Sequence, residues 1–178
     1  MTGDTTKLSI GREGFLGLDV LLGGEAMIGR SVMRVSGDVT YVPISAMHDA
    51  SKRFESFGNV MTRYAEAIVL QLLETVLSAR LDQAETQIAD WLSLADLRME
   101  GASFDLTQDS LAEVLGVNRI TVGKTLALLK RERILTYSRG VISIRRPAQL
   151  RRYGSESHLR ILKAFAWQDE AQHEVRPF

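Results

Sequence analysis

The stretch from Thr107 to Arg133, TQDSLAEVLGVNRITVGKTLALLKRER, limits most strongly what this chain can fold into. It predicts a helix over Gln108–Leu115, because Thr107 can cap the first turn and Gly116 tolerates the left-handed backbone that often ends a helix. Asn118 is then the expected cap of a second helix. Apolar residues recur at helical spacing, so each helix has one face to bury. These faces consist of Leu111, Val114 and Leu115 in the first helix, and Val122, Leu126 and Leu129 in the second.

The outer face of the second helix is polar and basic near its start, where a helix that enters the major groove carries its base-contacting side chains. Its members are Arg119, Ile120, Thr121 and Lys124. Basic residues near the helix end, Lys130, Arg131 and Arg133, are candidates for phosphate contacts. Any helical hairpin inside a bundle would show the same apolar spacing, so that interpretation stays open. The cap and the tight turn favour a DNA-binding helix-turn-helix.

Two short apolar runs follow at once, Ile134–Tyr137 and Val141–Ile144, around the turn Ser138-Arg139-Gly140. They predict a two-stranded β-hairpin. Arg139 at its tip is placed to reach a phosphate. A helix-turn-helix followed directly by such a hairpin is a winged helix.

The positive charge of the chain is concentrated in this module. Residues 103–152 carry 10 Lys and Arg against 4 Asp and Glu, whereas residues 1–102 carry 9 against 14, and the whole chain is neutral. A segment that approaches phosphates is expected to hold the positive charge. A solvated basic face with no partner is the alternative, and for the charge taken alone it is the commoner explanation.

Several classes of function are excluded or disfavoured. The 178 residues contain no cysteine, which excludes disulfides and iron–sulfur ligation. No run reaches the ~18 apolar residues of a membrane span, and residues 1–10 lack a secretion-signal pattern, so we expect a cytoplasmic protein with no membrane partner. His48, His158 and His173 are too scattered for a metal site, and solvated or capping roles are expected for them. Gly123-Lys124-Thr125 mimics the end of a P-loop but lacks its earlier glycine. We therefore expect no enzyme activity, no metal and no cofactor.

The N-terminal part reads as strands and turns. Arg30–Val35 and Asp38–Ile44 flank Ser36-Gly37 and predict a hairpin. A short helix is expected at residues 46–54, a long one at 59–81 and another at 83–99. A further short helix should begin at Pro147, and residues 156–172 could form an amphipathic tail helix.

The long helix carries two apolar stripes. One steps by alternating fours and threes, as in a heptad seam, and predicts a dimer interface with a second copy. It comprises Met61, Ala65, Ile68, Leu72, Thr75 and Ala79. The other stripe, which we expect to pack on the strands, comprises Val69, Leu73, Val76 and Leu77. Burial of both stripes inside one chain remains the alternative.

The order of these parts, over about residues 12–152, resembles the Crp/Fnr family of bacterial transcription regulators. The most specific likeness is LTQDSLAEVLGVNRITVGKTLALLKRERILTYSRGVISI, with its Thr121-Val122-Gly123-Lys124 run. The resemblance implies an α+β fold: a partial β-roll sensor region at 1–57, a dimerisation helix at 58–82, a winged-helix DNA-binding domain at 83–152 and a helical tail at 153–178. The DNA-binding residues expected from the pattern and the resemblance together are Thr107, Gln108, Asn118, Arg119, Ile120, Thr121, Lys124 and Arg139.

Two departures from the family pattern matter. Ile120 stands where the family often has an acidic residue, and an isoleucine cannot accept a hydrogen bond from cytosine, so its direct readout is limited to apolar contact such as a thymine methyl. In GFLGLDVLLGG, Leu18 stands where nucleotide-binding members have a glutamate, and Arg30 is out of register for the phosphate-binding arginine. Cyclic nucleotide binding is therefore not expected. The sensor region is short, as in a truncated chain or a member with a reduced sensor.

We expect a homodimeric, sequence-specific transcription regulator that binds a palindromic site on double-stranded DNA, with RNA polymerase as a further candidate partner. The alternative is a truncated partner that heterodimerises with a full-length regulator and modulates it. A weaker alternative is small-ligand binding between the strands and the long helix.

Overall fold

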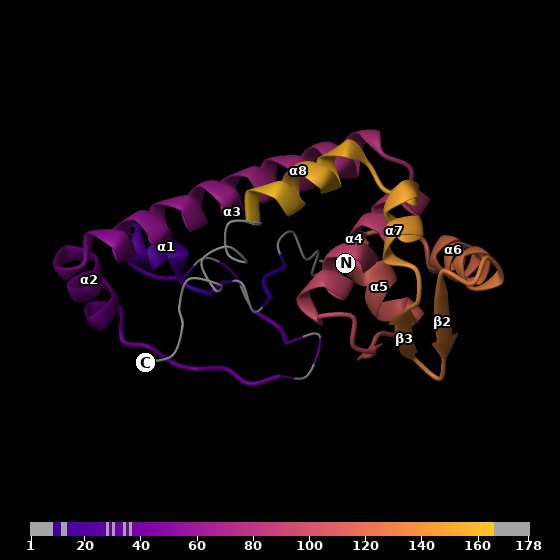
Figure 1. Cartoon of the computed structure of the whole chain (residues 1–178), viewed down its shortest axis with the longest axis horizontal. Coiled ribbons are helices and arrows are strands. Elements are labelled where there is room, and N and C mark those ends of the chain that lie inside the picture. Colours follow the sequence, from indigo (N-terminus) through magenta and orange to yellow (C-terminus); the bar gives the residue numbers. More distant parts are fainter. Residues whose placement is uncertain are drawn as a thin grey trace.

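The computed structural model describes residues 9–11, 14–27, 29, 31–33, 35 and 37–165. In that part of the chain a long helix, α3 (Glu55–Leu81), runs along one side of the molecule, and a winged-helix domain lies at one end (Figure 1). Two shorter helices, α1 (Leu18–Leu21) and α2 (Ile44–Arg53), lie near the start of α3. The helix α8 (Glu156–Phe165) returns from the winged helix and lies alongside α3.

The winged helix is built from short elements around a three-stranded antiparallel sheet of order β1-β3-β2. In chain order they are α4 (Ala84–Arg98), β1 (Phe104–Asp105), α5 (Gln108–Leu115), α6 (Arg119–Arg131), β2 (Leu135–Ser138), β3 (Val141–Ile144), α7 (Pro147–Leu150) and a 3-10 turn, η1 (Arg151–Tyr153). Phe104 pairs with Ile142, and Ile142 pairs on its other side with Tyr137.

One apolar core holds these elements together. Ile88 and Leu92 from α4, Leu111 from α5 and Leu129 from α6 are all fully buried in it. Each belongs to the apolar face of its helix, whose members recur three or four residues apart. The three helices therefore meet through the faces that the sequence periodicity predicts to be buried. The fold is thus α+β, as expected, and the two helices of the helix-turn-helix and its hairpin form where predicted. Strand β1 was not expected, because two residues are too few to show an alternating pattern.

The predicted N-terminal hairpin is wrong. The described residues of Arg30–Val35 and Asp38–Ile44 contain no strand, and Ile44 begins α2; residues 30, 34 and 36 lie outside the described part. Val35 packs against the winged-helix core, but Met33, Val39, Tyr41 and Val42 are exposed, so most apolar side chains of this segment have no surface over which a hairpin could pack. A lone two-stranded hairpin is marginal in water, and the alternation in the sequence is therefore not enough to form one.

The faces of α3 also differ from the prediction. Ile68, assigned to the dimer seam, is only 7% exposed and packs with Tyr64 and Ala67 against α8, so it is not available to a second chain. The stripe expected to pack on strands is exposed instead: Val69, Leu73, Val76 and Leu77 are 46–59% exposed. Of the other predicted seam residues, Leu72 and Ala79 are exposed, and Met61, Ala65 and Thr75 are half-buried.

Helix α8 covers the buried face of α3, the one that carries Tyr64, Ala67 and Ile68, through one ion pair and two apolar side chains. Arg160 Nη2 donates to Glu74 Oε2 at 2.9 Å, and Arg160 Nε donates to the other carboxylate oxygen. Ile161 and Phe165 are buried against the Tyr64 side of α3. The Arg160 guanidinium also holds the pKa of Glu74 below its ordinary value. The predicted tail helix is thus confirmed up to residue 165, and the rest of it lies outside the described residues.

Candidate nucleic-acid interface

The starts of α5 and α6 are both fixed by side-chain caps. Thr107 Oγ1 accepts a hydrogen bond from the Ser110 N–H at 3.1 Å, and Asn118 Oδ1 accepts one from the Ile120 N–H at 2.8 Å. Gly116, which ends α5, has φ of 66°, the left-handed conformation that glycine adopts at little cost. The caps satisfy backbone groups that would otherwise lack partners. Gly116 and Asn118 thereby set the turn between the helices, and Thr107 sets the start of α5, as the sequence predicted.

Helix α6 turns one face inward and presents the other to solvent. Val122, Leu126 and Leu129 are at most 2% exposed. Of the predicted DNA-binding residues, Thr107, Asn118, Arg119, Ile120, Lys124 and Arg139 are exposed, whereas Gln108 and Thr121 are half-buried. Seven of the eight therefore lie at or near the starts of α5 and α6, and Arg139 lies in the turn of the wing, where the adjacent Gly140 is close to Thr107.

Ile120 is the most unusual member of this face. It is 67% exposed on the first turn of α6, although nothing in the chain's own core requires a large apolar side chain there. In a major groove the apolar feature that such a side chain can contact is the C5 methyl of thymine. The position is thus suited to an apolar base contact and unsuited to hydrogen-bonded readout.

An ion pair that the sequence did not predict joins the two helices. Arg119 Nε lies 2.7 Å from Asp109 Oδ1, and both side chains are largely exposed. The two residues are ten positions apart and on different helices, so no local spacing rule connects them. Gln108 lies close to α6 as well, since a Cβ added at Gly123 would come within 3.2 Å of its Oε1. The glycine in the Thr121–Lys124 run therefore allows the first turn of α5 to approach α6 closely.

The wing is a tight hairpin whose two turn residues, Arg139 and Gly140, have φ of 51° and 81°. Positive φ at both positions is the pattern of the two-residue turns that match the twist of a hairpin. Lys130 Nζ donates to the Tyr137 carbonyl at 3.0 Å, which ties the wing to the end of α6. The Leu106 N–H donates to the Gly140 carbonyl at 2.7 Å from the other side. Two hydrogen bonds thus hold the wing that carries Arg139, and Lys130 uses one of its donors for one of them.

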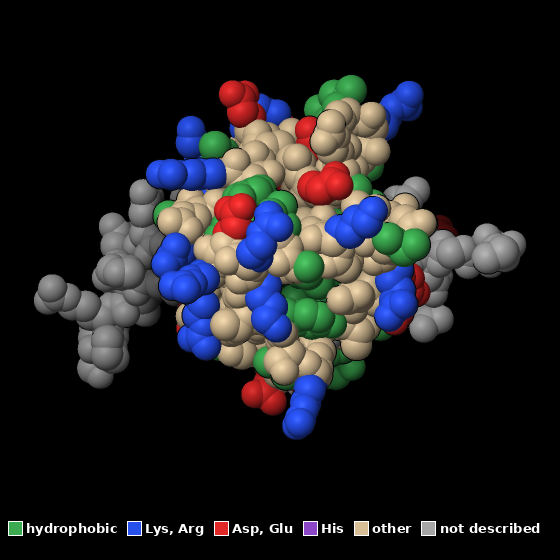
Figure 2. Space-filling model, turned by 90° about the vertical axis from the view of Figure 1, so that its right-hand side faces the viewer, with side chains coloured by type: hydrophobic (Ala, Val, Ile, Leu, Met, Phe, Trp, Pro, Cys, Tyr) green, Lys and Arg blue, Asp and Glu red, His purple; other side chains and the backbone are tan. Residues whose placement is uncertain are grey.

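The end of the molecule that carries α6 and the wing is basic at its surface. Figure 2, which views this end, shows Lys and Arg side chains spread over it, with fewer acidic ones. The exposed cations of this part are Arg119, Lys124, Lys130, Arg131, Arg133, Arg139, Arg145 and Arg146. Such a surface attracts a polyanion before any specific contact forms.

Buried titratable groups lie at the joint between α4 and α8, away from this surface. Asp90 accepts hydrogen bonds from Ser155 N at 3.0 Å and from Ser155 Oγ at 2.7 Å. Burial raises the pKa of Asp90 to about 6, although these hydrogen bonds oppose the rise. His158 is 1% exposed, and burial, helped by the charge of Arg151, lowers its pKa to about 4. The expectation that His158 is solvated or caps a helix is therefore wrong. His173 lies outside the described residues.

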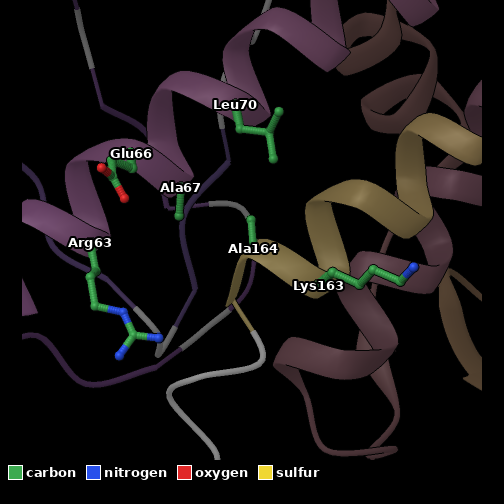
Figure 3. Close-up of a pocket in the computed structure, with 6 residues that line it drawn as sticks. All are labelled: Arg63, Glu66, Ala67, Leu70, Lys163 and Ala164. Atoms are coloured by element: carbon green, nitrogen blue, oxygen red, sulfur yellow. The ribbon is translucent and has the colours of Figure 1, made fainter.

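A shallow hollow of about 430 Å³ between α3 and α8 does not form a built site. Arg63, Glu66, Ala67 and Leu70 line it from α3, and Lys163 and Ala164 from α8. Figure 3 shows the Arg63 and Lys163 side chains extending in different directions, so their charges do not converge on one ligand atom. Among the described residues there is also no group of three or more side chains suited to a metal ion.

Comparison with known proteins agrees with this geometry. Residues 86–153 match the model of the Crp-like helix-turn-helix domain. This part of the chain is similar to Crp-like helix-turn-helix domains. The match contains α5, α6 and the wing, and so confirms the family resemblance where the sequence was most specific. A helix-turn-helix family is also consistent with the expectation that the chain is not an enzyme. A comparison with curated proteins found no match.

Several solved structures are similar to this chain over more residues than the helix-turn-helix match covers. FixK2 from Bradyrhizobium japonicum is 18% identical with a TM-score of 0.54, over 64% of this chain and 60% of its own. A protein from Eubacterium rectale described as a Crp/Fnr-family transcriptional regulator is 18% identical with a TM-score of 0.43, over 62% and 52%. A CooA variant from Carboxydothermus hydrogenoformans is 19% identical with a TM-score of 0.49, over 62% and 54%. The FixK2 match supports the fold, and the chain spans less than two thirds of each relative. In the described residues, no helix has the length and apolar character to cross a bilayer.

Proposed function

We propose that this chain is a transcription regulator that binds a palindromic DNA site as a homodimer, with α6 in the major groove. The observation that carries the proposal is the division of α6 into a fully buried apolar face and an exposed face bearing Arg119, Ile120 and Lys124. Side chains on the first turns of such a helix reach base edges when the helix lies in the groove. The proposal assigns base contacts to these three residues and to Thr121.

Phosphate contacts are assigned to the parts around α6. Thr107, Gln108 and Asn118 lie at helix starts, where backbone N–H groups and the helix dipole favour an anion. Arg139 is in the turn of the wing, whose neighbouring Gly140 lies close to Thr107, so it would extend the phosphate contacts made at the start of α5. Contacts of this kind fix the position of the protein on the duplex without reading its sequence.

The exposed stripe of α3 supports the dimer. Val69, Leu72, Val76 and Ala79 step by three, four and three residues, which is a heptad seam shifted from the one expected from the sequence. Leu73 and Leu77 widen this seam, so the exposed apolar surface is continuous along about three turns of the helix. Contiguous apolar surface of this kind marks a protein interface. On this basis we assign residues 58–82 to dimerisation, and the exposed basic face of α6 assigns residues 83–152 to DNA binding.

Selection from a randomised duplex DNA pool tests the proposal, combined with sedimentation of the protein alone and with the selected DNA. We expect an inverted repeat whose half-sites lie about one helical turn, ~10 base pairs, apart. Recovery of no motif, or of a single half-site bound by a monomer, contradicts it. A chain that binds the inverted repeat only after mixing with a different regulator supports the heterodimer alternative instead.

Two further expectations follow from the same proposal. A DNA-binding regulator works where the DNA is, so we expect a cytoplasmic location. RNA polymerase is a candidate partner for a regulator on its site, and retention of polymerase on the selected DNA only in the presence of this chain would support it.

A further inference from the structure

The ion pair between Asp109 and Arg119 is placed where it can affect base readout. Arg119 is the first residue of α6 and is exposed on the face assigned to the groove. Asp109 lies in the first turn of α5, which Gly123 allows to lie close to α6. The carboxylate therefore stands beside the arginine on a neighbouring rigid helix, rather than on the helix that enters the groove.

The atoms that meet leave the reading end of the arginine available. The closest contact joins Arg119 Nε to Asp109 Oδ1, at 2.7 Å. A guanidinium has five N–H donors, and the two terminal nitrogens are the pair that can bind guanine O6 and N7 side by side. A carboxylate held beside Nε restricts the rotation of the guanidinium, and its closest contact is not made to either terminal nitrogen.

Stabilisation of the fold does not explain this pair. Both side chains are well over half exposed, and an exposed ion pair adds little to stability. A negative charge beside a DNA surface also repels phosphates, so Asp109 weakens non-specific binding. The helix dipole favours an acidic residue in the first turn of α5. The place of its carboxylate beside Arg119 is explained if it orients a base-reading cation, because orientation lowers the conformational entropy lost on binding.

From these observations, which rest on the proposed DNA-binding function, we infer that Asp109 is a positioning residue for Arg119 and sets the preference for one base pair in each half-site. Asp109 itself contacts no base. It holds the arginine in a single orientation, and the preferred partner is a guanine in the major groove.

The test compares selection by full-length wild type with selection by five variants: Arg119→Ala, Asp109→Ala, Asp109→Glu, the double Ala variant and Asp105→Asn. We expect Arg119→Ala to abolish the preference at one base pair per half-site. Asp109→Ala should reduce the preference at the same base pair about two- to fivefold, the range expected for an exposed ion pair. Its affinity for random DNA should stay equal or rise, since a negative charge is removed. Asp109→Glu should restore much of the preference.

Two controls separate positioning from a structural effect. Asp109→Ala should add nothing at that base pair when Arg119 is already Ala, because the carboxylate acts through the arginine. Asp105→Asn removes an exposed carboxylate from β1 and should leave the preference unchanged. A structural role for Asp109 would lower the affinity for all sequences together with the melting temperature, and would contradict the inference.

The failure of this inference is distinguishable from that of the proposed function. If wild type selects an inverted repeat but Asp109→Ala keeps every base preference, the positioning role is wrong and the DNA-binding function stands. If Arg119→Ala also keeps every preference, the base contact assigned to Arg119 is wrong as well. If wild type selects no motif, the proposed function fails, and the inference fails with it.

Discussion

Helices α3 and α6 each bury one face and expose the other, but the exposed faces differ in chemistry. On α3, Leu73 and Val76 are 59% and 55% exposed and form part of an apolar stripe. On α6, Arg119 and Lys124 lie on either side of Ile120, the one large apolar side chain that this helix exposes. An apolar stripe is stabilised by another apolar surface, whereas a cationic face is suited to a polyanion. The periodicity of the buried residues predicts a helix in both cases, whereas the chemistry of the exposed residues indicates what kind of partner the helix binds.

The largest expected effect comes from breaking the apolar stripe of α3. Leu73→Asp places a charge in the proposed seam, so we expect the dimer to dissociate. Binding to the selected inverted repeat should then weaken on the order of 100-fold, because two half-sites are no longer bound as one unit. Sedimentation velocity measures the first effect and a fluorescence anisotropy titration the second.

The matched control for this variant is Leu159→Asp. Leu159 is 44% exposed on α8, outside the stripe, so the same charge there should leave both the dimer and DNA binding intact. If Leu73→Asp remains a dimer, or if both variants dissociate alike, the exposed stripe of α3 is not the dimer interface.

The next expected effect concerns the inner and outer sides of the helix-turn-helix. Leu111 is fully buried on α5, and its replacement by Ala should lower the free energy of unfolding by about 2–5 kcal/mol. Ile120→Ala removes a side chain of similar size from the exposed face, and should change it by less than about 0.5 kcal/mol. Urea unfolding followed by circular dichroism gives both values. Equal losses would mean that Ile120 is part of the core rather than of a contact surface.

A third effect tests the joint through which α8 connects the winged helix to α3. Burial lowers the pKa of His158 from 6.5 to about 4, so in this pH range the unfolded chain binds more protons there, and stability falls as the pH falls. Burial raises the pKa of Asp90 from 3.8 to about 6, so the folded chain binds more protons there, and this contribution rises as the pH falls from 6 to 4. The two slopes oppose each other in the wild type.

Removing one group at a time should therefore reveal the other. We expect Asp90→Asn to lose stability more steeply than wild type between pH 6 and 4, and His158→Leu to lose it less steeply. The midpoint of urea unfolding, measured at half-unit pH steps, records both slopes. Parallel curves for all three proteins would show that these groups are not buried at a joint.

The smallest expected effect is at the wing. Arg139→Asn removes the charge and keeps a residue that tolerates the positive φ of the turn. Losing one phosphate contact should weaken binding about two- to fivefold for every DNA sequence, and should lower the slope of log affinity against log salt by about 1. Titrations of selected and random DNA at several salt concentrations measure this. A loss confined to one base pair would assign Arg139 to base readout instead.

Local signals in the sequence predicted the winged helix well. Thr107, Gly116 and Asn118 are caps and stops that act within a few residues, and each has the expected role in the structure. The choice of face on α3 was missed for a physical reason: both stripes are apolar at helical spacing, and which one is buried depends on the long-range packing of Ile161 and Phe165 from α8. The Asp109–Arg119 pair was missed likewise, since it depends on how closely two helices approach each other.

The measurement that tests the central claim most directly is protection of guanine N7 from methylation on the selected DNA, because N7 lies in the major groove. With the wild-type dimer bound, we expect two protected patches ~10 base pairs apart on one side of the duplex. In Arg119→Ala, the guanine assigned to that side chain should lose its protection while its neighbours keep theirs. Uniform methylation along a duplex that is fully bound would contradict the placement of α6 in the groove.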